Sequence, residues 1–160
     1  LGKAFFVDVD LKNANLNETD CRGVKFQGAE FRGCTFQKAN LRRVDFSGLD
    51  LREVDFSEAD LRKTDMRSSN LQKARFFKAD LRDTLLSDAN LTFAYLSSAM
   101  MKGANLQLAN LNEAILRYSM NLTPAQIKSA RIDRKTKIPH YLELHWISET
   151  EFNCEEKEST

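Results

Sequence analysis

Residues 39–63 read ANLRRVDFSGLDLREVDFSEADLRK, which is five copies of one five-residue unit. Each unit has an aliphatic residue at its first position, Asp or Asn at its second, Leu or Phe at its third, and two polar or Gly residues at its fourth and fifth. The period extends in both directions, because every fifth residue from Phe6 to Leu116 is apolar, at 23 consecutive units. The second position is Asp or Asn in 14 of those 23 units. Such a long register without a slip predicts a repeat architecture.

A period of five fits neither an α-helix nor a flat β-strand. On a helix, five residues rotate the chain by about 140° beyond a full turn, which would scatter the Leu and Phe column around the axis. On a strand, side chains alternate with a period of two, so an odd step changes face every time. The column can share one core only if the chain turns by a fixed angle in each unit. The sequence therefore predicts an all-β solenoid whose coils stack through strand-like hydrogen bonds.

The units resemble the A-(D/N)-L-x-x motif of the pentapeptide-repeat family. The match covers residues 4–118. The clearest units are Ala39-Asn40-Leu41, Ala59-Asp60-Leu61, Ala79-Asp80-Leu81, Ala89-Asn90-Leu91, Ala104-Asn105-Leu106 and Ala109-Asn110-Leu111. The resemblance implies a right-handed quadrilateral β-helix with four units per coil and about six coils over residues 1–120, with the first and third positions of each unit inward. We expect a C-terminal helical cap over residues 121–147 and an acidic flexible tail over residues 148–160.

The cap is predicted from the residues that follow the last repeat. The register ends at Asn121, where an inward apolar residue is due. Thr123 suits a helix N-cap, with Pro124 at N1 and Gln126 at N3 completing a capping box. A short helix through about residue 131, with Ile127 and Ala130 turned inward, would cover the open end of the core. We expect Trp146 farther on to pack against an apolar corner of the last coils, and the chain to fray from residue 148.

The family's twenty-residue coil sorts the outward residues by face, and one face carries a column of basic residues. This candidate basic ridge consists of Arg22, Arg42, Arg62, Arg82 and Lys102. Asp or Asn at the second positions of the same face would form a parallel column beside it. The ridge is therefore either a self-neutralising, solvated surface or a site for a partner or an anion, and exposed ion pairs contribute little to stability in the first case.

A second candidate site lies in the later coils, where outward positions become apolar. The candidate partner surface consists of Phe77, Phe93, Tyr95, Ile115 and Tyr118. The family geometry places Phe93, Tyr95 and Ile115 on or near one corner. Exposed apolar clusters are normally covered by something. Either the C-terminal segment of the chain packs back onto this corner, or the corner is a docking or dimer surface.

Residues that could support catalysis or hold a cofactor are sparse. The pattern shows no Gly-rich phosphate loop, no nucleophile with a paired His, and no concave pocket that would gather the Asp residues, so an enzyme, a catalytic site and a cofactor are not expected. His140 and His145 are five residues apart, which does not place two ligands on one helix face, so we expect no metal. Cys21 and Cys34 occupy inward positions and are expected to be buried small residues, with no disulfide between them.

Composition limits the partners further. The 160 residues contain 24 Lys+Arg and 23 Asp+Glu, a formal net charge of +1. This balance argues against nucleic-acid binding, and no apolar run approaches the roughly 18 residues of a membrane span. The first coil begins without a cover, which suggests an upstream segment, a processed signal, or a homodimer contact through a terminal coil or the cap. A cytoplasmic location is the default, and a periplasmic or luminal one would follow from a removed signal.

Two hypotheses for function remain from the sequence. The first is a non-enzymatic, rigid scaffold that presents flat β faces to another protein. The second follows from the resemblance, since some pentapeptide-repeat proteins mimic duplex DNA and bind DNA gyrase or a related topoisomerase. That mimicry requires a dominant negative face, whereas residues 1–118 carry 18 Lys+Arg against 16 Asp+Glu. The charge balance disfavours the second hypothesis.

Overall fold

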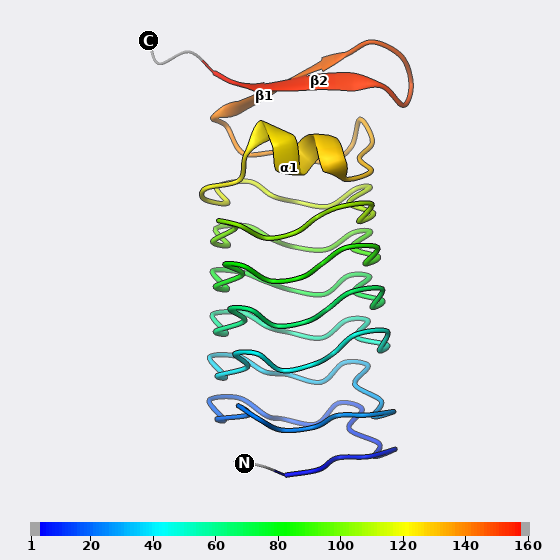
Figure 1. The fold of residues 1–160 in the computed structure, drawn as a ribbon, viewed down its shortest axis with the longest axis vertical. Coiled ribbons are helices and arrows are strands. Elements are labelled where there is room, and N and C mark those ends of the chain that lie inside the picture. The colour runs from blue at the N-terminus through cyan, green and yellow to red at the C-terminus, as the bar shows by residue number, and fades with distance from the viewer. Residues whose placement is uncertain (1–3, 158–160) are drawn as a thin grey trace.

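The backbone closes one coil every twenty residues. In the computed structural model, which describes residues 4–157, second positions bridge in parallel to the second position four units later, from Phe5 with Lys25 to Met100 with Met120. Within these residues, only Lys25 with Asp45 and Glu30 with Asp50 lack such a bridge. Leu41 N donates to the Asp60 carbonyl at 2.9 Å, and Asp60 N donates to the Ala39 carbonyl at 2.9 Å. The coils stack along one long axis (Figure 1). The expected twenty-residue coil of four units is confirmed.

The turn that ends each unit explains why Asp and Asn dominate the second position. The fifth position has a left-handed backbone, with φ of 59° at Lys63 and 74° at Gly23. An Asp or Asn side chain supports this turn by accepting a hydrogen bond from the backbone N–H two residues later, as Asp55 Oδ1 does from Ser57 N at 2.9 Å. The sequence pattern is therefore an Asx turn at each corner whose unit carries Asp or Asn.

The third positions form one continuous core along the axis, and its N-terminal half is a stack of Phe rings. Phe36 and Phe56 lie twenty residues apart with their ring centroids at 5.5 Å, and Phe56 and Phe76 lie at 5.3 Å, all three fully buried. The rings of each pair are nearly parallel, at 4° and 13°. Cys21 and Cys34 are also fully buried, as their inward positions predict. Because one coil is twenty residues long, these Phe rings stack on one another in successive coils of the core.

The C-terminal end of the core is closed by helix α1 (Pro124–Ser129). Asn121 has a φ of 58° and Leu122 takes the core position one residue late, which shifts the register before the helix. Thr123 is the N-cap and forms the predicted capping box with Gln126. The Gln126 amide also donates to the carbonyls of Met101 and Ala104, at 2.9 and 2.8 Å. Ile127 and Ala130 are buried, and the helix ends at Ser129.

Beyond α1 the chain forms an antiparallel hairpin of β1 (Leu142–Trp146) and β2 (Phe152–Glu156). The expected frayed tail over residues 148–160 is wrong for residues 152–156, because β2 pairs along its whole length with β1 and buries Cys154. Trp146 packs on Phe152, with ring centroids 5.3 Å apart, and under the Arg134 guanidinium at 5.0 Å. The expectation that Trp146 packs on the apolar corner is therefore wrong, since β2 supplies its partner. The last residues, 158–160, lie outside the described chain.

Helices able to cross a membrane are absent from residues 4–157.

Candidate protein-interaction face

One face of the column carries most of the exposed aromatic residues. We call it the Tyr95 face. Its second positions are joined from coil to coil by parallel bridges, and they are Asn15, Thr35, Asp55, Arg75, Tyr95 and Ile115. The turn before each of these residues forms one edge of the face, and the turn after it forms the other. The same side-chain position is thus repeated about every 4.8 Å along the axis.

The structure brings all five residues of the candidate partner surface onto this face. Tyr95 and Ile115 lie in its centre, Phe93 lies on one edge, and Phe77 and Tyr118 lie on the other edge. Phe77, Phe93, Tyr95 and Tyr118 are 44%, 41%, 46% and 67% exposed, and Ile115 is partly buried. Phe93, Tyr95 and Ile115 thus lie at or beside one edge of the face, and Phe77 and Tyr118 extend the surface to the opposite edge.

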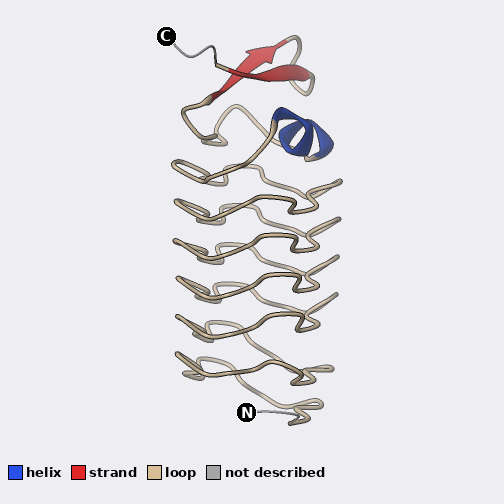
Figure 2. Ribbon diagram, turned by 60° about the vertical axis from the view of Figure 1, so that its left-hand side comes forward, coloured by secondary structure: helices blue, strands red, loops and turns tan. Residues whose placement is uncertain are grey.

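The C-terminal segment leaves this face uncovered. Helix α1 and the hairpin continue along the long axis, past the last coil (Figures 1 and 2). The expectation that the segment folds back onto the aromatic residues is wrong, because Leu122 and Ile127 are used to close the end of the core. Of the two alternatives from the sequence, an exposed docking surface is the one that the geometry leaves open.

Charged residues on the Tyr95 face are arranged in two rows. Glu53, Asp55 and Glu58 form an acidic row within one coil, and Lys73, Arg75 and Lys78 form a basic row in the next coil. Burial alone would raise the pKa of Asp55, but hydrogen bonds from Ser57 and Gln37 outweigh it and lower that pKa. A hollow of about 510 Å³ lies beside these rows on the Phe93 edge, and one of about 580 Å³ lies on the Phe77 edge.

The basic row also contacts the aromatic residues. The Arg75 guanidinium lies 6.0 Å from the centroid of the Tyr95 ring, and the Lys78 ammonium lies 5.1 Å from that of Phe77. Such cation–π contacts hold the basic side chains over apolar surface and contribute about 0.5–1 kcal/mol at exposed sites. The face therefore offers acidic, basic and aromatic rows in that order along the axis.

On the basic ridge, by contrast, charges pair within the same face. Arg62 contacts Asp60 at 2.6 Å, and its Nε lies 3.4 Å from Asp80, so the pairs continue from coil to coil. Further pairs join Arg22 to Asp20 at 2.6 Å, Arg82 to Asp80 at 2.6 Å, and Arg42 to Asp60 at 4.0 Å. Lys102 forms no ion pair with any residue of the described range. This ladder is the arrangement expected of a self-neutralising surface.

The Asp–Arg pairs on the ridge and on the other faces predict a loss of stability in acid. Hydrogen bonds from Arg22 lower the pKa of Asp20 to about 2, and those from Arg52 and Arg67 lower the pKa values of Asp50 and Asp65. A carboxyl with a lower pKa in the folded state stabilises the fold above its unfolded pKa of about 3.9 and loses that contribution as the pH falls. We expect the free energy of unfolding to decline between about pH 4 and pH 2 in urea titrations.

The matched control for this experiment is a triple Asp→Asn variant at Asp20, Asp50 and Asp65. Asn occupies the same unit position at Asn40 and Asn90, where its Oδ1 still accepts from the backbone N–H of the turn. Asn does not titrate, so the variant should show a shallower decline in acid. An equal decline in the variant and the wild type would show that these carboxylates are not its source.

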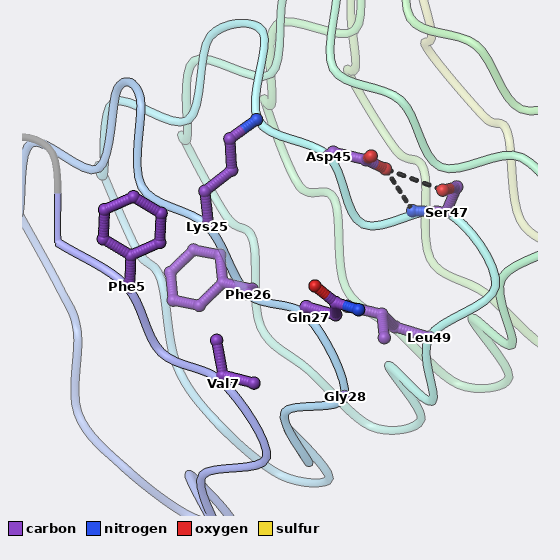
Figure 3. Close-up of a pocket in the computed structure, with 9 residues that line it drawn as sticks. All are labelled: Phe5, Val7, Lys25, Phe26, Gln27, Gly28, Asp45, Ser47 and Leu49. Atoms are coloured by element: carbon purple, nitrogen blue, oxygen red, sulfur yellow. Dashed lines mark hydrogen bonds between the residues drawn. The ribbon is translucent and has the colours of Figure 1, made fainter.

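The N-terminal end has a separate apolar hollow of about 540 Å³ (Figure 3). Phe5 and Val7 border it and are largely exposed, whereas Phe6 turns inward and stacks on Phe26 at 5.5 Å. Asp45 accepts hydrogen bonds from Ser47 at its rim, from the backbone N–H at 2.9 Å and from the hydroxyl at 2.7 Å.

Residues with metal-binding or nucleophilic side chains are scattered. Within residues 4–157, no three His, Cys, Asp or Glu residues gather in a way that could hold a metal ion. The three cysteines are free and buried, and burial raises the pKa of the Cys34 thiol to about 12. His145 contacts Glu155 across the hairpin at 2.9 Å.

Comparison with known proteins places the repeats in a described family. The profile for pentapeptide repeats matches eight copies, over residues 4–43, 39–76 and 79–117. The comparison with curated proteins found no match.

Three similar solved structures are QnrB1, HetL and Rfr23. QnrB1, a plasmid-mediated fluoroquinolone resistance protein, is 19% identical over 88% of this chain and 87% of its own, with a TM-score of 0.46. HetL, a pentapeptide-repeat protein involved in heterocyst differentiation regulation in Nostoc sp. strain PCC 7120, is 20% identical over 86% and 75%, with a TM-score of 0.31. Rfr23 from Cyanothece 51142 is 24% identical over 84% and 90%, with a TM-score of 0.37.

Proposed function

Because this chain belongs to the pentapeptide-repeat family, we propose that it is a non-enzymatic scaffold, built as a right-handed quadrilateral β-helix, that binds another protein through the Tyr95 face. The observation that carries this proposal is the exposure of Phe77, Phe93, Tyr95 and Tyr118 on one face of a regular column. Aromatic residues are enriched at protein–protein interfaces because they bury a large area at low entropic cost.

The rigidity of the column supports a binding role. Parallel bridges join the coils along the whole Tyr95 face, from Asn15 to Ile115, so the positions of this face are fixed relative to one another before any partner arrives. A preorganised surface loses little conformational entropy on binding. The scaffold therefore needs no conformational change to present its aromatic and charged rows.

The gyrase-binding alternative remains the weaker proposal. A mimic of duplex DNA needs carboxylates that are free to replace phosphates over a continuous surface. On the ridge face, Asp60 and Asp80 are instead engaged by Arg62 and Arg82 at 2.6 Å. On the Tyr95 face, the acidic row is followed directly by the basic row. Neither face offers the unbroken negative charge that mimicry requires.

The proposal predicts that Phe93→Ser combined with Tyr95→Ser abolishes capture of the protein partners that the wild-type chain retains in a pull-down. Truncating a central aromatic anchor costs 2 kcal/mol or more in typical interfaces, about a 30-fold loss of affinity. Both side chains point outward, so the fold and its thermal midpoint should be unchanged. Recovery of the same partners by this variant would count against the face as the binding site.

Ile147 provides a matched control for that experiment. It is 67% exposed and lies just after β1, away from the coils. Ile147→Ser therefore removes a comparable apolar side chain from the surface without touching the Tyr95 face. It should retain the partners that the double variant loses.

A further inference from the structure

We infer that the Tyr95 face binds a second copy of the same chain, with the two columns side by side and antiparallel. The inference rests on the proposed function, because it names the partner of that face. It places the contact on the side of the column, and not at a terminal coil or the cap. Three features support it: the charged rows, their symmetry and the position of the aromatic rows.

The first feature is the row arrangement itself. The acidic row (Glu53, Asp55 and Glu58) occupies one edge, the centre and the other edge of the face, and the basic row (Lys73, Arg75 and Lys78) occupies the same three positions one coil later. Within residues 4–157, none of the three basic side chains forms an ion pair. These three cations are therefore free to pair with a partner, whereas Glu53 of the acidic row already contacts Arg32 of the preceding coil at 3.2 Å.

The second feature is that the rows complement themselves under one rotation. Consider a two-fold axis that lies in the contact plane, runs perpendicular to the column and passes between the two rows. Rotation about it places the second column antiparallel to the first. Each edge of the face then lies opposite the same edge of the second copy. Glu53 then faces Lys73 of the second copy, Asp55 faces Arg75, and Glu58 faces Lys78. An isologous contact of this kind forms every pair twice.

The same geometry rejects the parallel arrangement. With the axis along the column, each row faces itself, so three carboxylates would oppose three carboxylates and three cations would oppose three cations. Juxtaposed like charges cost several kcal/mol at an interface. Charge complementarity thus selects one orientation of the second copy.

The third feature is the fit of the aromatic row. In the antiparallel arrangement, the row that contains Phe93 and Tyr95 falls opposite the row that contains Gly33 and Thr35. Gly33 has no side chain, and the Asn13 amide oxygen lies beside it, so the Phe93 ring would pack over Gly33 and Asn13 together. Phe77 falls opposite Ser57, another small residue. Two of the bulky residues of one copy, Phe93 and Phe77, therefore meet small residues of the other, as shape complementarity requires.

The test reverses the charges at the edges of the rows. One variant carries Glu53→Lys and Glu58→Lys, and the other carries Lys73→Glu and Lys78→Glu. All four positions are fifth positions with a left-handed φ between 55° and 63°, and this chain already places both Glu and Lys at such positions, so both variants should fold normally. Each variant alone would oppose like charges, whereas an equimolar mixture would restore opposite charges in a heterodimer.

We expect sedimentation velocity at about 0.1 mM protein to show a dimer for the wild type, since a micromolar contact is nearly saturated at that concentration. Each variant should associate about 100-fold more weakly and sediment as a monomer, and the mixture should sediment as a dimer. Added salt should weaken the wild-type dimer. Lys63→Glu, at a fifth position beside the ridge, is the control and should remain dimeric.

The outcomes separate this inference from the proposed function. A wild-type monomer at 0.1 mM, or variants that dimerise as the wild type does, would overturn the antiparallel dimer. If the pull-down still depended on Phe93 and Tyr95 in that case, the scaffold would stand with a different protein as its partner. If the dimer formed as described but the pull-down did not depend on these residues, the face would serve self-association only.

Discussion

Phe56→Ala is expected to lower the free energy of unfolding by about 3–5 kcal/mol, the range for removing a buried Phe ring. Phe56 is fully buried and stacks between Phe36 and Phe76, at 5.5 and 5.3 Å. Its removal opens a cavity in the middle of the column. The neighbouring coils cannot close that cavity, because their spacing is fixed by backbone hydrogen bonds such as Phe56 N to the Arg75 carbonyl at 2.7 Å.

Urea titration followed by circular dichroism measures this effect, and Phe56→Leu is the matched control. Leu occupies the same unit position at Leu51 and Leu61, so the backbone there accepts it. The control should cost clearly less than the alanine variant, because most of the buried volume is retained. Equal losses for the two variants would mean that backbone strain, and not the cavity, determines the cost.

Ile127→Ala is expected to cost about 2–5 kcal/mol, the second-largest effect among these predictions. Ile127 is the fully buried residue of helix α1, and this helix is the cover of the last coil. A six-residue helix has little stability of its own, so it stays in place through this packing and through its capping box. Loss of the side chain should expose Leu122 and the last inward residues of the column.

Hydrogen exchange distinguishes local from global loss in this variant. We expect the amides of α1 and of the last coil to exchange much faster in Ile127→Ala, while those around Phe56 keep their protection. Ile127→Val, which removes one methyl group, should cost about 0.5–1.5 kcal/mol. Uniformly faster exchange along the whole chain would show that the cap and the coils unfold as one unit.

The inward positions and the start of the cap were predictable from sequence because both are encoded locally. The inward positions follow from a period that never slips between Phe6 and Leu116. The start of α1 follows from Thr123 and Gln126, whose side chains act within one helical turn of each other. Short-range signals of this kind do not depend on where the rest of the chain lies.

The hairpin and the uncovered Tyr95 face were not predictable in the same way. Strand β2 lies in an acidic segment with two inward apolar residues, Phe152 and Cys154, and it becomes a strand because Trp146 and the rest of β1 lie beside it. The C-terminal segment could cover either the side of the column or its open end, because both surfaces are apolar. The sequence does not show which of the two surfaces the segment packs against more favourably. Contacts made across the fold decided both outcomes.

The sequence by itself determined the period, the identity of the inward residues and the start of the cap, because each depends on residues only a few positions apart. The five-residue period alone does not say which outward residues share a face, because that depends on how many units close one coil. Tyr95, Arg75 and Asp55 lie in successive coils and meet because twenty residues close one coil, and Phe93 and Tyr118 reach that face from its opposite edges. This face is exposed because α1 covers the end of the core and leaves the side of the column free.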